Sequence, residues 1–221
     1  RFLCAVMMGC LALGGAAQAK AANVTVDPGA TWLGFMNVFE LPANGGAYVF
    51  GSGWGTADLV ATFSGPVLTL SPNTIGDPNP FWYTPSGGPG AQGNKIMEAN
   101  MYVENDSLVG QTVTFEGIVL SNTLVSPYTS IAFIKDFAPD YSSFTQVDVP
   151  LTPGPFSVTL ATNPAPGRHV QYGFQTVGPN VWITDVGPLG NVQVTAIPEP
   201  SSALLAAACA AAAVVRRRRV R

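Results

Sequence analysis

The sequence predicts an all-β protein whose strands form a β-sandwich or jelly roll, flanked by a signal peptide and a C-terminal hydrophobic sorting helix. Polar and apolar residues alternate with a period of two in several short segments, as expected for strands that bury one face. Clusters of Gly, Pro and Asn separate these segments, and the 221 residues include 24 glycines and 19 prolines. The central region carries no apolar helical stripe. Many short strands between such turns are typical of sandwiches and barrels.

The predicted strands are of two kinds. Regular alternation predicts strands at 112–116, 156–160, 169–175 and 191–195. Apolar or mixed segments predict further strands at 31–38, 47–50, 58–63, 67–70, 96–104, 129–137, 145–149 and 181–184. Turn clusters lie between them at 42–46, 153–155 and 163–167. Together these segments describe one domain, at 20–196, which is long enough to bury a substantial core.

The N-terminal residues 1–19 have the composition of a secretory signal peptide. A basic residue, Arg1, precedes an apolar stretch at 2–17. This stretch is followed by a small-x-small cleavage site in which the small residues are Ala17 and Ala19. The sequence therefore predicts that the chain is exported.

The C-terminal residues 197–221 combine three elements in a fixed order. Pro198, Glu199 and Pro200 come first, and an apolar, alanine-rich run follows at 203–215. The chain then carries four consecutive arginines, which are Arg216, Arg217, Arg218 and Arg219. As a helix the run would span roughly 20 Å, against about 30 Å for a hydrocarbon core. An amphipathic or core helix would need a polar face, and the run has none. It predicts a transient membrane segment with its arginines on the cytoplasmic side.

This combination of motif, short apolar helix and basic end resembles the PEP-CTERM sorting signal of Gram-negative and related bacteria, which membrane-embedded exosortases recognise. The resemblance implies that Pro198, Glu199 and Pro200 form a processing site. It also implies the exosortase and the secretion machinery as partners. The chain would be membrane-associated before processing, and the mature protein would lie at the cell surface or in the extracellular matrix.

Composition excludes several classes of function for the central domain. The three cysteines, Cys4, Cys10 and Cys209, all lie in the terminal segments. The 20–196 region therefore has no disulfide and no thiolate metal site, although export would permit disulfides. Four basic and twelve acidic residues give this region a net charge of about −8. Nucleic acid and anionic membrane surfaces are poor partners for such a charge.

Segments between Gly110 and Val194 carry a second resemblance. They are the stretches 110–115, 132–137 and 171–175, and the Trp182-Ile183-Thr184-Asp185 sequence near the end. They resemble carbohydrate-binding modules with a galactose-binding-like jelly roll. The resemblance implies a sugar ligand, such as extracellular polysaccharide. A structural calcium ion is also common in such modules, and Asp185 is the one position that the resemblance names.

Two groups of residues are candidates for glycan contact, because sugar rings stack on aromatic side chains and bind amides. One is an aromatic triplet in the Gly- and Pro-rich loop 77–94, and the other is a tryptophan with polar strand residues. The candidates are Phe81, Trp82, Tyr83, Trp182, Gln171 and Gln175. Alternatively, the loop is a lid that buries its three rings, and Trp182 is covered by a loop or by a second layer. The lid is the favoured interpretation for the triplet.

The sequence gives little support for catalysis, and no cofactor is expected. With His169 as the only histidine, a His-rich zinc site is excluded, and no nucleophile-elbow motif is present. A glycosidase needs only two facing carboxylates, for which the candidates are Glu98, Glu104, Asp106, Glu116 and Asp185. We therefore expect a non-catalytic surface or matrix protein that binds polysaccharide. The alternatives are a structural surface protein without a small ligand and a carboxylate-dependent glycoside hydrolase.

Overall fold

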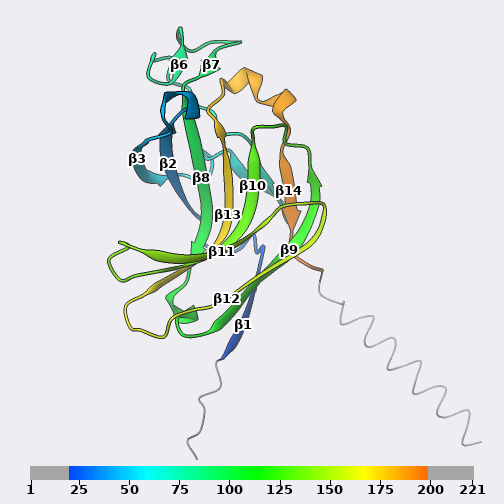
Figure 1. Ribbon diagram of the computed structural model, residues 1–221. Helices are drawn as coiled ribbons and strands as arrows, with labels where there is room; N and C mark the ends of the chain where they lie inside the picture. The colour runs from blue at the N-terminus through cyan, green and yellow to red at the C-terminus, as the bar shows by residue number, and fades with distance from the viewer. Residues whose placement is uncertain (1–19, 199–221) are drawn as a thin grey trace, which may run out of the picture.

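The computed structural model describes residues 20–198, which form an all-β fold with two open six-stranded sheets (Figure 1). Sheet 1 is built around β9 (Thr112–Asn122), its longest strand. One edge of β9 pairs with β12, and the other pairs with β1 in parallel and then with β14. β14 continues to β5 and β4. The bounds are β1 (Ala21–Thr25), β4 (Ala61–Ser64), β5 (Val67–Leu70), β12 (Gly154–Ala161) and β14 (Val192–Thr195).

Sheet 2 has the strand order β11-β10-β13-β8-β2-β3, and every neighbouring pair is antiparallel. The hairpins β2–β3 and β10–β11 form its two edges, and β8 and β13 lie between them. Its strands are β2 (Leu33–Glu40), β3 (Tyr48–Trp54), β8 (Lys95–Glu104), β10 (Thr129–Phe137), β11 (Phe144–Pro150) and β13 (His169–Pro179).

The two sheets face each other across an aromatic core. Phe115 of β9 packs against Phe174 of β13, with ring centroids 5.3 Å apart, and against Phe156 of β12 at 5.4 Å. Trp32, from the loop between β1 and β2, stacks on Phe174 at 6.0 Å. Such rings bury large apolar areas, so this cluster supplies much of the stabilisation between the layers.

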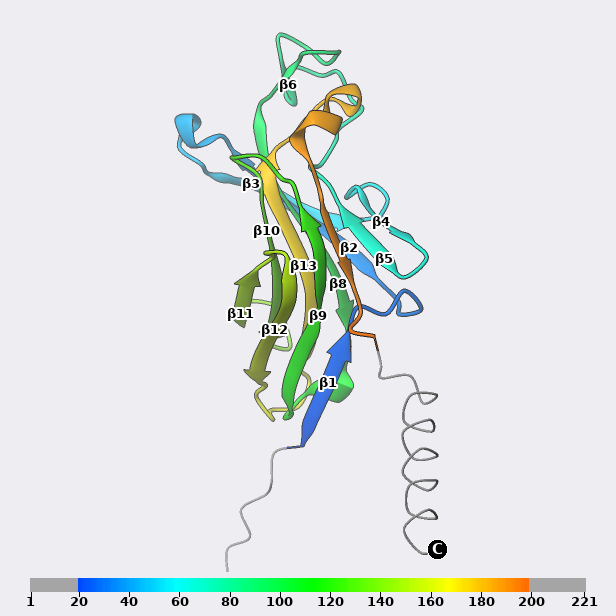
Figure 2. The ribbon, with the colours of Figure 1, turned by 90° about the vertical axis from the view of Figure 1, so that its right-hand side faces the viewer.

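Two loop segments gather at one end of the sandwich, opposite the end where β1 begins (Figures 1 and 2). They include the short strands β6 (Tyr83–Thr84) and β7 (Gln92–Gly93) and the 3-10 helices Ile183–Asp185 and Gly187–Leu189. The Tyr83 side chain is fully buried there, and its hydroxyl donates to the carbonyl oxygens of Ile75 and Val181.

Most strand predictions are confirmed, and those at 67–70 and 129–137 match β5 and β10 at both ends. The prediction of a strand at 181–184 is wrong. Val181 makes only an isolated bridge with Thr74, and the 3-10 helix Ile183–Asp185 follows. β13 ends at Pro179, whose ring removes the backbone donor that a continuing ladder would need.

Two other differences from the sequence analysis have clear physical causes. The strand predicted at 58–63 begins at Ala61, because residues 55–60 form consecutive turns. The sequence analysis did not predict β1, because its Ala-rich sequence has weak strand propensity. This segment is a strand because it pairs with β9.

The predicted sorting segments lie mostly outside the described residues. Ala17 and Ala19 precede them, and Glu199, Pro200 and the four arginines follow them. Pro198 is described, and it is exposed after β14. Among residues 20–198 no helix has the length and apolar character needed to cross a bilayer.

Candidate functional site

The outer face of sheet 2 carries a row of polar and aromatic side chains. Strand alternation in β8 sends Met97, Ala99, Met101 and Val103 into the core. The residues between them, Glu98, Asn100, Tyr102 and Glu104, therefore lie on the opposite face. β8 thus provides a strip of hydrogen-bonding groups along the middle of the sheet.

Asn100 is the centre of a hydrogen-bond network on this face. Its Oδ1 accepts from the Lys135 ammonium at 2.9 Å and from the Gln175 amide at 3.0 Å. Its Nδ2 donates to Glu98 Oε1 at 3.3 Å, and the same oxygen accepts from the Asn37 amide at 2.9 Å. Because Asn100 is only 3% exposed, its amide orientation is fixed by these partners. The network links β2, β8, β10 and β13.

Lys135 is a buried cation in the floor of this face. Its residue is 7% exposed, and its ammonium lies 4.3 Å from the ring centroid of Phe133 and 5.5 Å from that of Phe144. Burial lowers the pKa of Lys135, and the charges of Glu98 and Asp148 oppose that shift. The two rings and the Asn100 oxygen replace part of the hydration that the ammonium loses.

A second network lies where β8 ends. Glu104 accepts from the Gln171 amide at 2.8 Å and from the Tyr141 hydroxyl at 3.1 Å. Burial, with the nearby charge of Glu104, raises the pKa of Tyr141 to about 12. His169 Nδ1 lies 3.1 Å from a carboxylate oxygen of Asp106. These contacts tie the turn 138–143 to β8 and β13.

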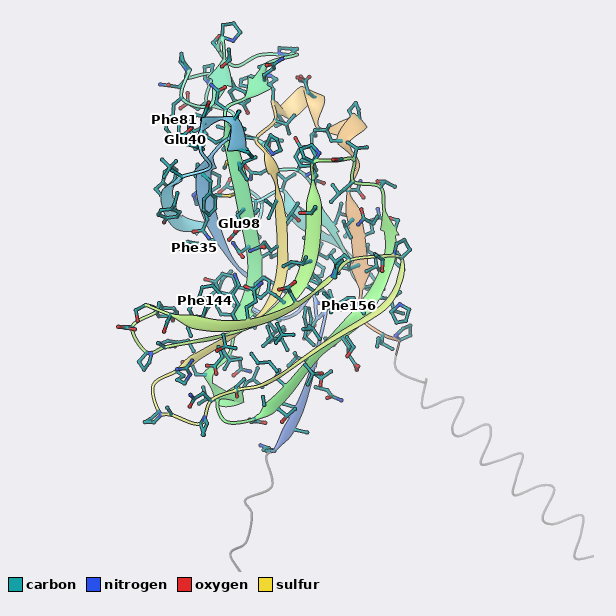
Figure 3. The ribbon with its side chains drawn as sticks, viewed as in Figure 1. Phe35, Glu40, Phe81, Glu98, Phe144 and Phe156 are labelled. Atoms are coloured by element: carbon teal, nitrogen blue, oxygen red, sulfur yellow. The ribbon has the colours of Figure 1, made fainter. Side chains whose placement is uncertain are left out.

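The two networks form the floor of a groove of about 580 Å³, to which all six strands of sheet 2 contribute. Aromatic rings line it from both edges of the sheet and from its floor: Phe35, Tyr48, Tyr102, Phe137, Tyr141 and Phe144. In Figure 3, Phe35, Glu98 and Phe144 lie on the same side of the molecule, away from Phe156 of sheet 1. The groove therefore combines apolar surfaces with fixed polar groups.

Exposed aromatic side chains are concentrated at this groove. Among the described residues, four aromatic side chains are strongly exposed: Tyr48 at 59%, Phe144 at 53%, Tyr141 at 46% and Phe81 at 39%. The first three line the groove. Phe81 lies elsewhere, packed edge-on against Trp82 and beneath the Lys95 ammonium. Exposed rings that cluster on a concave surface indicate a binding site.

The residues predicted for glycan contact divide into two sets. Gln171 lines the groove, and Gln175 belongs to the Asn100 network. Tyr83, Trp82, Phe81 and Trp182 form a separate cluster in the loop region, in which Trp182 is half-buried and meets Tyr83 edge-to-face at 5.4 Å. None of these four lines the groove. Trp182 is not on a strand face, contrary to the sequence analysis.

The candidate carboxylates are spread over the molecule. Glu98 and Glu104 both line the groove, but they stand six positions apart on one face of β8, so their Cα atoms are about 20 Å apart. Glu116 lies on β9 of sheet 1, and Asp185 accepts from the backbone N–H of Gly90. Only Glu104 and Asp106 come together, and with His169 they place one ligand atom each within 4.8 Å of the others. That trio is the one His and carboxylate group among the described residues that could hold a metal ion.

Sequence reasoning missed most of the groove. Its aromatic lining and the pair of Asn100 and Lys135 were not identified. The signal was the lysine at position 135, which directly follows the apolar segment 131–134 of β10. A charged residue on a central strand requires partners on neighbouring strands. The sequence does not tell which strands are neighbours, so it could not identify those partners.

No protein-family model, no curated protein and no solved structure matches this chain.

Proposed function

We propose that the groove on sheet 2 binds polysaccharide, and that the protein is an exported, non-catalytic component of the cell surface or extracellular matrix. One observation carries the binding proposal: three of the four strongly exposed aromatic side chains border a floor of fixed amides and carboxylates. A pyranose ring has apolar faces that stack on such rings and hydroxyls that need such polar partners.

The floor of the groove is organised before any ligand binds. Asn100, Glu98 and Gln171 are each held by hydrogen bonds to neighbouring strands. Groups that are already ordered lose little side-chain entropy on binding, so more of the interaction free energy appears as affinity. The volume of about 580 Å³ also falls within the usual range of ligand sites.

Export and sorting remain proposals that rest on the terminal sequence motifs. The described chain supports access to the proposed processing site, because Pro198 is exposed and follows β14 of sheet 1. The groove lies on the other sheet. The jelly-roll topology and a structural calcium ion likewise stay predictions of the galactose-binding-like resemblance.

The spacing of the carboxylates favours binding over hydrolysis. A retaining glycosidase needs carboxyl groups about 5 Å apart, and an inverting one needs them about 6.5–9.5 Å apart. The Cα atoms of Glu98 and Glu104 are about 20 Å apart by strand geometry, which is too far for their side chains to bring the carboxyl groups within either range. Asp106 comes within 4.8 Å of Glu104, which would suit a retaining enzyme, but only Glu104 of this pair lines the groove. We expect no turnover of any polysaccharide that the protein binds.

Affinity gel electrophoresis of the purified protein in a panel of polysaccharides tests the binding proposal. In a gel that retards the wild type, Tyr48→Ala and Phe144→Ala should each weaken binding by at least tenfold, about 1.4 kcal/mol. Phe81→Ala is the matched control, since it removes an exposed ring outside the groove and should leave retardation unchanged.

Two results would contradict the proposal. One is a panel in which no polysaccharide retards the folded protein. The other is retardation that survives both groove substitutions but is lost in Phe81→Ala. Circular dichroism of each variant would separate lost contacts from lost structure.

A further inference from the structure

We infer that the groove selects uncharged polysaccharide chains and rejects polyanionic chains such as polyuronates. This inference rests on the proposed binding function and specifies its ligand class. It follows from three features: the groove carries more carboxylates than cations, its single cation already has partners within the protein, and the rest of the described chain is acidic.

The fixed charges in the groove are predominantly negative. Two carboxylates, Glu98 and Glu104, line it together with one ammonium, that of Lys135. Amide donors from Asn37 and Gln171 hold these carboxylates in place, so they cannot swing away from an approaching anion. A carboxylate with fixed geometry can still accept a hydrogen bond from a sugar hydroxyl, whereas a second carboxylate would be repelled.

The one cation in the groove already interacts with other groups of the protein. The Lys135 ammonium donates to Asn100, lies over two aromatic rings and is 7% exposed. Glu98 and Asp148 interact favourably with its charge. A uronate that paired with Lys135 would have to enter beside Glu98, and it would compete with the Asn100 oxygen for the ammonium.

The surroundings add to the repulsion of anions. Lys95 pairs with Glu40 at 3.0 Å, and Arg168 pairs with Asp136 at 2.7 Å, which neutralises two of the four basic residues in the described chain. Most of the twelve acidic residues have no such partner. The faces of the aromatic rings that line the groove are also electron-rich. The resulting negative field reduces the local concentration of polyanions.

Pairs of polymers with similar backbones, one charged and one uncharged, test the inference. Polygalacturonate is compared with its carboxyl-reduced form, and carboxymethyl cellulose with hydroxyethyl cellulose, by affinity electrophoresis of the full chain. We expect the uncharged member to bind at least tenfold more tightly. Salt should narrow the difference, because the Debye length falls from about 10 Å near 0.1 M to about 3 Å near 1 M.

Paired substitutions assign the effect to the groove. Glu98→Gln combined with Glu104→Gln keeps acceptor oxygens but removes both charges, and should reduce the preference for the uncharged polymer at least tenfold. Glu116→Gln removes a charge from sheet 1 instead and should leave the preference unchanged.

Equal or tighter binding of the anionic member would overturn the inference while leaving the binding function intact. Loss of that binding in Lys135→Met would then identify the ammonium as an anion receptor. If neither polymer pair nor any neutral polysaccharide bound, the proposed function itself would fall.

Discussion

The phenol ring of Tyr141 lies flat against the imidazole ring of His169, with centroids 4.4 Å apart and planes 5° from parallel. Tyr141 has a positive φ of 57°, which is uncommon for a bulky residue. Its hydroxyl donates to Glu104, so a strained backbone is held by a ring contact on one side and a charged hydrogen bond on the other. The exposed remainder of the ring forms part of the groove wall.

This arrangement predicts an unusual titration. Burial and Glu104 raise the pKa of Tyr141 to about 12 from an ordinary value of 10.0. A tyrosine whose pKa is higher when folded stabilises the fold below pH 10, and that contribution is lost as the pH rises from about 10 to 12. Glu104→Gln should lower this pKa. NMR titration of labelled tyrosine, with the signal assigned by Tyr141→Phe, would measure it. An unchanged pKa in Glu104→Gln would contradict the assigned contact.

Asn100→Ala should destabilise the protein by about 1–3 kcal/mol, because the Lys135 ammonium and the Gln175 amide both lose their acceptor in a buried place. Urea denaturation measures the free energy of unfolding. In a Lys135→Met background the same substitution should cost at least about 0.5 kcal/mol less, since no buried charge is left unpaired. If the two substitutions changed the free energy of unfolding additively, Asn100 and Lys135 would not be energetically coupled.

Asp136→Ala should cost about 3–5 kcal/mol, because it leaves a partly buried Arg168 guanidinium without its carboxylate. Asp136 is 2% exposed, and it also accepts from the backbone N–H of Asn163 at 2.7 Å. The comparison is Asp58→Ala, which removes an exposed carboxylate in the turn 55–60 and should change stability by less than about 0.5 kcal/mol. Similar losses in the free energy of unfolding for both variants would show that the buried ion pair stabilises the fold no more than an exposed carboxylate does.

Trp182→Ala should lower the free energy of unfolding by about 2 kcal/mol and leave polysaccharide binding unchanged. Its ring packs on the buried Tyr83 and fills the space that a Cβ at Gly87 would need. Thermal denaturation and affinity electrophoresis of the same samples would measure the two effects. Loss of binding in a folded Trp182→Ala protein would place the glycan site in the loop region instead of the groove.

Gly173→Ala should destabilise the fold by about 1–3 kcal/mol through overpacking. β13 approaches β8 so closely that an added Cβ would lie 2.6 Å from the Tyr102 Cα and would meet the Met101 carbonyl. Gly76→Ala is a suitable control, because nothing lies within 4 Å of its Cβ position. Equal melting temperatures for the two variants would contradict the close approach of the strands.

The strands of this fold were largely predictable, because alternation is a local property. The 169–175 pattern, for example, correctly places Gln171 and Gln175 on one face and Tyr172 and Phe174 in the core. Trp182 was misplaced because a strand was assumed to continue beyond Pro179, where the chain instead turns into a 3-10 helix.

The groove was not predictable for a different reason. Its residues come from six strands, and no rule of local sequence states which strands are neighbours. Phe144 and Tyr48 begin two strands that lie at opposite edges of sheet 2, some 96 positions apart in the chain. Only the strand order β11-β10-β13-β8-β2-β3 brings their rings to one concave face.

That strand order has a mechanical consequence. The edge hairpins β2–β3 and β10–β11 are joined to each other in sheet 2 only through β8 and β13. A polymer chain that filled the groove, as proposed, would touch all six strands and would brace one hairpin against the other. Tension applied along that chain would then be shared across the width of the sheet and would load many interstrand hydrogen bonds together. Under tension, the retention of a bound polymer would depend on the shear strength of the whole sheet, rather than on any single contact.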